Sequence, residues 1–135
     1  LRSEKTAAQK GIKPLARIVA SATFAQDPNY FTTAPVGAIK KALALANLKV
    51  SDINLWEINE AFSVVTLVAM KQLEIPRDRV NVHGGAVSIG HPIGASGARV
   101  LTTLVHGLHT HGKRYGLATL CIGGGEAVAM IIERG

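Results

Sequence analysis

The sequence predicts an α/β domain in which a largely parallel sheet is covered by helices, in the order β-α-β-α-β-α-β-β after a short leading helix. Apolar runs of strand length alternate with longer stretches of helical periodicity, and crossovers of this length join parallel strands. Of the residues, 47% are hydrophobic and 18% are charged, which is typical of a domain with a buried sheet. A chain of 135 residues buries roughly two-thirds of its unfolded surface, so we expect one domain with a single core.

The first half of the chain is expected to form two helices and two strands. Ser3 is a helix N-cap residue and Gly11 a helix stop, so a short helix precedes the first strand. Pro35 suits a first helical turn because its missing N–H needs no partner there, and apolar residues recur after it at helical spacing. The predicted segments are a helix at 3–10, a strand at 15–24, a loop at 27–35, a helix from 35 to about 48 and a strand at 54–58.

The second half is expected to hold two buried helices and three strands. EAFSVVTLVAMKQLE, residues 60–74, is apolar nearly all round, which predicts a helix buried between layers that ends before Pro76. YGLATLCI and AVAMIIE are separated by GGGE, which indicates an antiparallel pair. The other predicted segments are a strand at 80–82, a buried helix at 98–108, and the two closing strands at 115–122 and 127–133.

Charge and cysteine content exclude several classes of protein. The net charge is +6, from 15 Lys and Arg against 9 Asp and Glu, but the basic residues are scattered, so no nucleic-acid partner is expected. No stretch approaches the roughly eighteen apolar residues of a membrane span, so we expect a soluble protein without a membrane partner. No signal or transit peptide is visible. The single cysteine, Cys121, excludes an internal disulfide and suits a reducing compartment.

Three polar or reactive side chains are expected at one edge of the sheet. In open α/β sheets, ligands bind beyond the carboxyl ends of the strands, where loops lead into helices. Asn59 follows a predicted strand, His91 lies between a strand and a helix, and Cys121 ends a strand before three glycines. We therefore expect these three residues to line one pocket.

The glycine-rich segment NVHGGAVSIGHPIGASG, residues 81–97, is suited to holding His91 in one place. Its glycines permit positive φ and close backbone approach, and Pro92 restricts the residue after the histidine. GASG at 94–97 opens a helix whose free N–H groups favour a negative charge, such as a phosphate, thiolate or enolate. In CIGGG, residues 121–125, glycines after a thiol expose backbone N–H donors, as an oxyanion hole requires.

Each of these features also has an ordinary structural interpretation. A lone cysteine packs as a small hydrophobe, and a loop histidine is often a hydrogen-bonded surface residue. Asn59 is a common N-cap residue, and a run of glycines is common in hairpin turns. Taken singly, none of them identifies a function.

Together, however, the motifs resemble a known family. NEAF at 59–62, GGAVSIGHPIGASGAR at 84–99 and CIGGG at 121–125, in this order and at these spacings, resemble the C-terminal half of thiolases, most of all the biosynthetic, acetoacetyl-CoA type. PLARIVA at 14–20 and the AP-V stretch at 34–36 are similar to that family as well. The resemblance implies that residues 1–135 form a thiolase C-terminal domain and that the N-terminal half, with its nucleophilic cysteine, is absent.

The resemblance implies roles in the reversible Claisen condensation of two acetyl-CoA to acetoacetyl-CoA, or in thiolysis of 3-ketoacyl-CoA. Cys121 matches the second cysteine of thiolases, the acid and base for the acetyl-CoA methyl carbon, and a modest lowering of its pKa would suit that role. His91 matches the histidine that activates the nucleophilic cysteine and donates a ring N–H to the thioester oxygen. Asn59 matches the residue that holds a water in the same oxyanion hole, and Gly123 matches a backbone N–H donor of a second one.

Substrate contacts follow from the same resemblance. Phe62 matches a contact to the pantetheine arm, with Ala61 beside it, and Phe31 matches a residue near the acyl pocket, although both aromatics are equally typical of a core. Glu60 is expected to give structural support, and His83 stands where many thiolases have Asn. No cofactor other than coenzyme A, as substrate, and no metal is implied.

The expected partners complete what the chain lacks. Because Cys121 is already assigned as acid and base, no cysteine is left for the acylated nucleophile, and the chain is expected to be inactive alone. The partners implied are a CoA thioester, the N-terminal thiolase domain of the same enzyme, and further copies in a dimer or tetramer. The likeness leans to mitochondrial acetoacetyl-CoA enzymes, so we expect the mitochondrial matrix, with cytoplasm or peroxisome as alternatives. The final ERG is no peroxisomal address.

Three alternatives remain open. A thiolase-like domain without catalysis could serve as a binding or assembly module. Ketoacyl synthases share the fold but carry a second histidine where this chain has Cys121, so the cysteine favours a thiolase. A metal-binding protein could use several imidazoles and the thiol, but no spacing matches a standard zinc site. The side chains concerned are those of His83, His91, His106, His109, His111 and Cys121.

Overall fold

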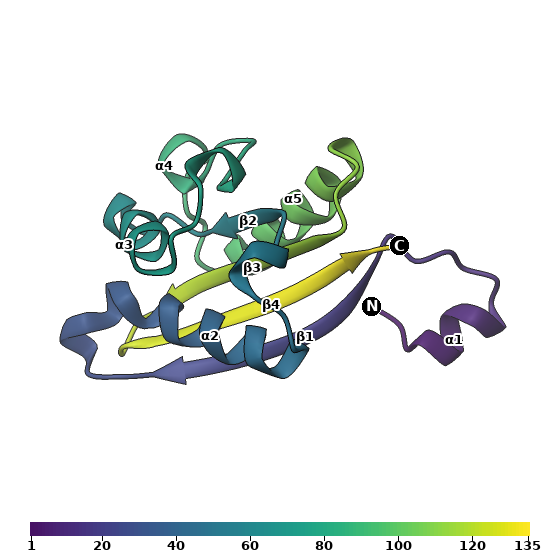
Figure 1. Ribbon diagram of the computed structural model, residues 1–135, viewed down its shortest axis with the longest axis horizontal. Coiled ribbons are helices and arrows are strands. Elements are labelled where there is room, and N and C mark those ends of the chain that lie inside the picture. The colour runs from purple at the N-terminus through teal and green to yellow at the C-terminus, as the bar shows by residue number, and fades with distance from the viewer.

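One mixed sheet organises the molecule in a computed structural model that describes residues 1–135 (Figure 1). Its four strands lie in the spatial order β1-β4-β3-β2. The α/β class predicted from the sequence is confirmed. The strands are β1 (Ala16–Ala25), β2 (Leu55–Ile58), β3 (Tyr115–Ile122) and β4 (Glu126–Arg134).

The helices follow the predicted order with small shifts at their ends. Beyond the predicted helices, the loop expected at 27–35 contains a 3₁₀ turn, and a one-turn helix forms inside the glycine-rich segment. The α-helices are α1 (Glu4–Gln9), α2 (Ala34–Ala46), α3 (Ser63–Leu73), α4 (Ala86–Ile89) and α5 (Ser96–Thr110); the 3₁₀ helices are η1 (Pro28–Thr33), η2 (Val50–Asp52) and η3 (Arg77–Arg79). None of them combines the length and apolar character needed to cross a bilayer.

The prediction of a largely parallel sheet is wrong, and the cause is the position of β4. Only β2 and β3 pair in parallel, whereas β4 pairs antiparallel with both β1 and β3. These pairings mean that β1, β2 and β3 all run in the same direction, as helical crossovers require. The closing hairpin, however, inserts β4 between β1 and β3, which turns two of the three contacts antiparallel. The carboxyl ends of β2 and β3 still share one edge of the sheet.

The strand predicted at 80–82 does not form. Val80 makes one isolated parallel bridge to Trp56 on the outer side of β2, and the chain then turns away. Asn81 takes the left-handed conformation, with φ of 48°, which no strand residue adopts. The prediction of a strand at 80–82 is therefore wrong.

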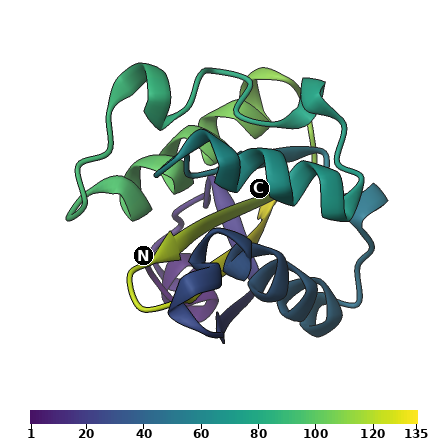
Figure 2. The same ribbon diagram turned by 90° about the vertical axis from the view of Figure 1, so that its left-hand side faces the viewer.

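The two faces of the sheet carry separate hydrophobic clusters. Alternation along β2 directs Trp56 and Ile58 to the cluster formed with α2 and α3, and directs Leu55 to the cluster formed with α5. Val100 and Leu104 begin the apolar stripe by which α5 packs on its face, so the two helices α2 and α5 lie on opposite sides of the sheet (Figure 2). A single core was expected, and the sheet divides it into two.

Helix α3 is buried on one side only. Val65 and Ala69 are fully buried, but Val64 and Leu67 on the other side are 44% and 58% exposed. The expectation that this helix is buried between two layers is therefore not met within these residues, because nothing in the chain packs over its second face.

Candidate active site

His91 is held by the first turn of α5. Its Nδ1 lies 2.6 Å from Ser96 Oγ, and Ser96, which is fully buried, donates its own hydroxyl proton to the carbonyl of Pro92 at 3.0 Å. Pro92 O also accepts the amides of Ala95 and Ser96 at 2.8 Å, so the loop closes into the helix start immediately after the histidine. The loop and the first turn of α5 thus hold the imidazole through Ser96.

This network determines where His91 carries its proton. The single hydroxyl proton of Ser96 is directed to Pro92, so Ser96 Oγ is the acceptor and His91 Nδ1 is the donor. In neutral His91, Nε2 is therefore the unprotonated nitrogen. It faces Asn59 Nδ2 at 3.4 Å, a long contact in which the amide donates. The free lone pair on Nε2 makes His91 a base that becomes an N–H donor once it has taken a proton.

Asn59 is placed by the end of the β2–β3 ladder. Its backbone N–H donates to the carbonyl of Thr119 at 3.0 Å. This bond extends the parallel pairing of β2 and β3 one residue beyond the end of β2. The side chain is 2% exposed, and its Oδ1 is buried without a hydrogen-bond donor from the protein. An unpaired buried amide oxygen costs about 1–3 kcal/mol, so Oδ1 is suited to accept a hydrogen bond from a small polar molecule.

Asn81 and Glu60 tie the histidine loop to the end of β2. The Asn81 side chain accepts from the amide of Ile58 at 2.8 Å and donates to its carbonyl at 2.9 Å, so it replaces a neighbouring strand. Glu60 accepts from Asn81 Nδ2 at 3.1 Å and from the amide of Val87 at 2.9 Å. The structural role expected for Glu60 is consistent with these contacts. A Cβ on Gly85 would displace the Glu60 carboxyl group and so disturb its hydrogen bonds to Asn81 and Val87.

Cys121 is the next-to-last residue of β3, at the same edge of the sheet. The backbone of Asn59 is bonded to Thr119, two residues before the thiol, but Cys121 makes no hydrogen bond to Asn59 or His91. The side chain is half-buried against the α2–α3 cluster. Burial raises the pKa of the Cys121 thiol above its ordinary value, so the chain alone favours the thiol over the thiolate. The lowering considered from the sequence is not present in this chain.

The predicted glycine donor, Gly123, begins the turn between β3 and β4. Gly124 and Gly125 follow with φ of +91° and +84°. The carbonyl of Gly125 accepts from the amide of Gln26 at 3.0 Å, and a Cβ on Gly125 would overlap the carbonyl oxygen of Gln26. Gly125 is therefore required for the close approach of the turn to the end of β1.

Replacing Gly125 by alanine is expected to lower the free energy of unfolding by about 2 kcal/mol, because the new Cβ meets backbone atoms as well as an unfavourable φ. The measurement is urea unfolding. Gly124→Ala is the matched control: its φ is similar but its surroundings are open, so we expect a smaller loss of about 1 kcal/mol. If both variants lose the same free energy of unfolding, the overlap with Gln26 does not contribute to the stability of the turn.

The aromatic residues assigned to substrate contacts meet at the surface. Phe31, from η1, and Phe62, just before α3, pack edge to face with ring centroids 5.9 Å apart, and Phe62 is 60% exposed. Ala61 is half-buried beside Phe62.

The other histidines do not gather into a site. No group of three or more His, Cys, Asp or Glu side chains is arranged to hold a metal ion. His83 and His111 stack with centroids 5.2 Å apart, and His109 lies 2.7 Å from the carbonyl of Leu15. The alternative of a metal-binding protein therefore has no cluster to support it.

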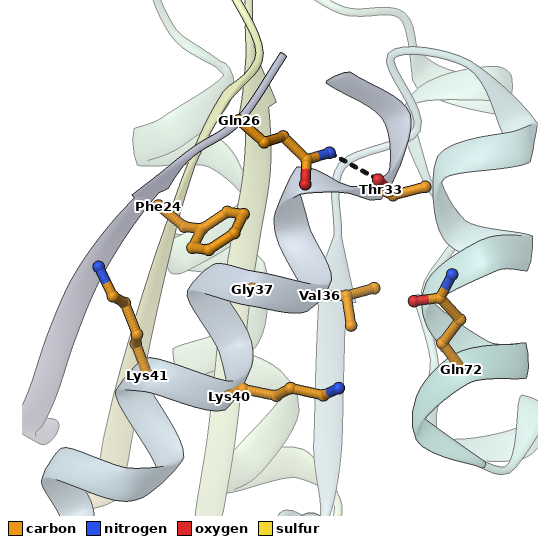
Figure 3. Close-up of a pocket in the computed structure, with 8 residues that line it drawn as sticks. All are labelled: Phe24, Gln26, Thr33, Val36, Gly37, Lys40, Lys41 and Gln72. Carbon is orange, nitrogen blue, oxygen red and sulfur yellow. Dashed lines mark hydrogen bonds between the residues drawn. The ribbon is translucent and has the colours of Figure 1, made fainter. Parts of the chain in front are cut away.

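A shallow pocket of about 410 Å³ lies elsewhere, between the end of β1, the start of α2 and α3 (Figure 3). Its two lysines diverge: Lys41 extends beside Phe24, 5.7 Å from the ring centroid, and Lys40 extends toward Gln72. Gln26 bonds Thr33 across the opening at 2.6 Å. No residue of NEAF, of the glycine-rich segment or of CIGGG lines it.

The motifs and their geometry agree with the comparison to known proteins. The family model described as thiolase, C-terminal domain, matches residues 12–134. The chain is a thiolase C-terminal domain. The mitochondrial acetyl-CoA acetyltransferase of Rattus norvegicus is 52% identical over 134 residues, which are 99% of this chain and 31% of that protein.

Solved thiolase structures carry the same fold. The acetyl-CoA acetyltransferase of Bacillus anthracis superposes with a TM-score of 0.96 at 44% identity, over 98% of this chain and 34% of that one. Human mitochondrial 3-ketoacyl-CoA thiolase in complex with CoA gives 0.96 at 40% identity, again over 98% and 34%. This thiolase domain thus spans about a third of the length of its relatives.

Sequence reasoning missed two residues of the site. Ser96 determines the tautomer of His91, and Asn81 anchors the loop that carries it. A signal for Ser96 was present in GASG, where a serine in the first turn of a helix can reach back to the preceding loop. Asn81 gave no such signal, because its role depends on the end of β2, more than twenty residues earlier.

Proposed function

We propose that this thiolase domain forms the C-terminal part of an acetyl-CoA acetyltransferase. The reaction is the reversible Claisen condensation of two acetyl-CoA to acetoacetyl-CoA and CoA, or the thiolysis of 3-ketoacyl-CoA. The observation that carries the proposal is the Ser96–His91–Asn59 arrangement, which leaves Nε2 as a base next to an amide group. Such a base takes a proton from an attacking thiol and then, as an N–H, donates a hydrogen bond to a thioester oxygen.

Asn59 and His91 supply two parts of the proposed oxyanion hole. Asn59 Oδ1 accepts a hydrogen bond from a water, and that water donates its other hydrogen bond to the thioester oxygen, beside the Nε2–H of protonated His91. The buried, unpaired Oδ1 supports this assignment, because a fully paired amide has no capacity to hold a water. Two donors aimed at one oxygen stabilise an enolate more than either does alone.

Cys121 exchanges the proton at the substrate carbon. In cleavage its thiol protonates the departing enolate, and the raised pKa of the half-buried thiol favours this protonated form. In condensation the thiolate is required, so we assign the lowering of its pKa to charges outside this chain. Gly123 donates its N–H in the second oxyanion hole, and Phe31, Ala61 and Phe62 contact the acyl and pantetheine parts of the substrate.

The N-terminal thiolase domain of the same enzyme is the proposed partner, and it carries the nucleophilic cysteine. Two uncovered apolar surfaces support such a partner: the outer side of α3 with Val64 and Leu67, and a groove of about 930 Å³ between α1, β1 and α5. Apolar surface of this extent is seldom left in water. We further propose a dimer or tetramer, and the mitochondrial matrix as the compartment, following the Rattus norvegicus relative.

A chimeric enzyme tests the function. Residues 1–135 replace the matching C-terminal third of the Bacillus anthracis acetyl-CoA acetyltransferase, whose fold superposes with a TM-score of 0.96. We expect thiolysis of acetoacetyl-CoA by the chimera and none by the isolated chain, which lacks the nucleophile. A folded but inactive chimera would instead support a binding or assembly module, and turnover by the isolated chain would contradict the assignment of Cys121.

Two histidine variants of the chimera, one at the candidate site and one outside it, test whether the activity depends on His91. His91→Gln is expected to lower turnover by about 10²–10⁴-fold, the usual contribution of an acid–base group. His109→Gln changes the same residue type at an exposed position of α5 and is expected to leave turnover within about twofold. If both variants lower turnover to the same extent, His91 has no specific role in the chemistry.

A further inference from the structure

The outer edge of β1 has no neighbouring strand. β1 lies at one end of the strand order and pairs only with β4, so every second residue directs its N–H and C=O away from the sheet (Figure 1). The pairing slips between Ile18 and Ala20, which leaves a regular edge from Ala20 to Ala25. An open, regular edge of this kind pairs with another extended segment when one is offered.

The backbone groups that point outward are those of Ser21 and Thr23. Gln26 donates its N–H to the carbonyl of Gly125 at 3.0 Å, so residue 26 faces β4. Because neighbouring residues of an antiparallel strand alternate in this respect, Thr23 and Ser21 face away from β4. The contact of Lys41 agrees, since its Nζ donates to the carbonyl of Thr23 at 3.2 Å from the open side. Both residues are exposed to solvent.

Lys41 gives this edge a positive charge without a carboxylate partner. Both ion pairs of the structure belong to Glu133, and Lys41 is exposed on α2 with its Nζ 5.7 Å from the centroid of the Phe24 ring (Figure 3). At the carbonyl of Thr23, the lysine takes the place that a peptide N–H has inside a sheet. A segment that adds to β1 offers its own N–H to Thr23 and releases the ammonium group for an acid.

We propose that the edge of β1 from Ala20 to Ala25 is a docking surface for an extended, acidic segment of a partner protein. Backbone hydrogen bonds to Ser21 and Thr23 hold the segment, and a carboxylate beside them pairs with Lys41. A second copy of this chain fits less well, because two such edges would bring two Lys41 ammonium groups onto one strand pair. The start of β1 borders the groove assigned to the N-terminal domain and lies outside this surface. The inference does not depend on the proposed function.

Binding of a synthetic peptide by the 135-residue chain tests the proposal. The probe is a capped peptide of alternating valine and threonine with a pair of glutamates at each end. We expect the NMR amide signals of residues 20–25 to shift as the probe is added. The same peptide with glutamines should bind about fivefold more weakly, which is the upper range for one exposed ion pair. A probe methylated at its backbone nitrogens should not bind. No binding, or equal binding of the glutamate and glutamine peptides, would overturn the proposal.

Two neighbouring lysines separate a binding role of Lys41 from simple protection of the edge. Lys41→Gln is expected to weaken binding of the glutamate peptide about fivefold. Lys40→Gln is the matched control, because that side chain extends toward Gln72 instead, and it should change binding by less than about twofold. A lysine that only guards the edge against pairing has the opposite effect, since its removal would tighten binding or make the chain self-associate. Either of those two results would contradict the proposal.

A proline on the edge and hydrogen exchange in the chimera complete the test. Ser21→Pro removes an outward N–H and no bond to β4, so the fold should persist while peptide binding falls about tenfold. In the chimera we expect the amides of Ser21 and Thr23 to exchange fast without the peptide and slowly with it. Slow exchange without the peptide would mean that another part of the enzyme covers the edge, and the proposal would fail whether or not the proline variant folds.

Discussion

Cys121→Ser in the chimera is expected to lower the rate of acetoacetyl-CoA synthesis by about 10²–10⁴-fold. A serine hydroxyl is a far weaker acid than a thiol, so it cannot supply the base that removes the proton from the acetyl-CoA methyl group. The change is nearly isosteric at a half-buried position, and the fold should tolerate it. The measurement is the rate of acetoacetyl-CoA formation from acetyl-CoA under saturating conditions.

The two half-reactions distinguish this role from a structural one. Acyl transfer to the nucleophilic cysteine of the N-terminal part does not need Cys121, so a single equivalent of CoA should still be released when Cys121→Ser meets acetyl-CoA. His91→Gln should impair that release as well, because the base for the nucleophile is removed. If Cys121→Ser abolishes the first release of CoA, the thiol acts in acylation or in folding, and its assignment to the carbon acid is lost.

How much of the fold could be predicted depended on how local each signal is. The strand YGLATLCI was placed at 115–122, the bounds of β3, because its residue types and flanking breaks are read within a few positions. Helix α2 ends where Asn47 takes a left-handed conformation, an ordinary C-cap for Asn. The sheet order had no such signal, since β1 pairs with β4 across more than a hundred residues.

For the candidate site too, local features could be predicted from the sequence, whereas contacts between distant segments could not. Asn59 and His91 were expected to meet because each follows a predicted strand, and in the structure their side chains do lie 3.4 Å apart. The strand expected before His91 does not form, so the loop between α4 and α5, and not a strand end, brings the imidazole to Asn59. The burial of Glu57 was not foreseen. In the sequence it is the one charged residue of the short strand LWEI, and the packing of α5 over β2, which removes it from water, has no local signal.

Glu57 should also make the stability of the chain fall as pH rises. Burial, Glu60 and Arg99 together move its pKa from 4.5 to about 7 in the folded protein, so between these values the folded state holds a proton that the unfolded state has lost. Stability from this group is therefore greatest below about pH 4.5 and levels off above about pH 7. At about 1.4 kcal/mol per pKa unit, the fall amounts to about 3 kcal/mol.

Glu57→Gln removes this titration and isolates its effect. We expect the variant and the unmodified chain to unfold at similar urea concentrations at pH 4.5, and the variant to be more stable by about 3 kcal/mol at pH 8. Glu133 acts in the opposite sense, because Arg17 and Arg114 hold its pKa below the usual range and their pairing is lost as pH falls. That contribution is common to both proteins and cancels in their difference. A difference that is constant with pH would mean that Glu57 is ionised throughout, and that Arg99 compensates its burial in full.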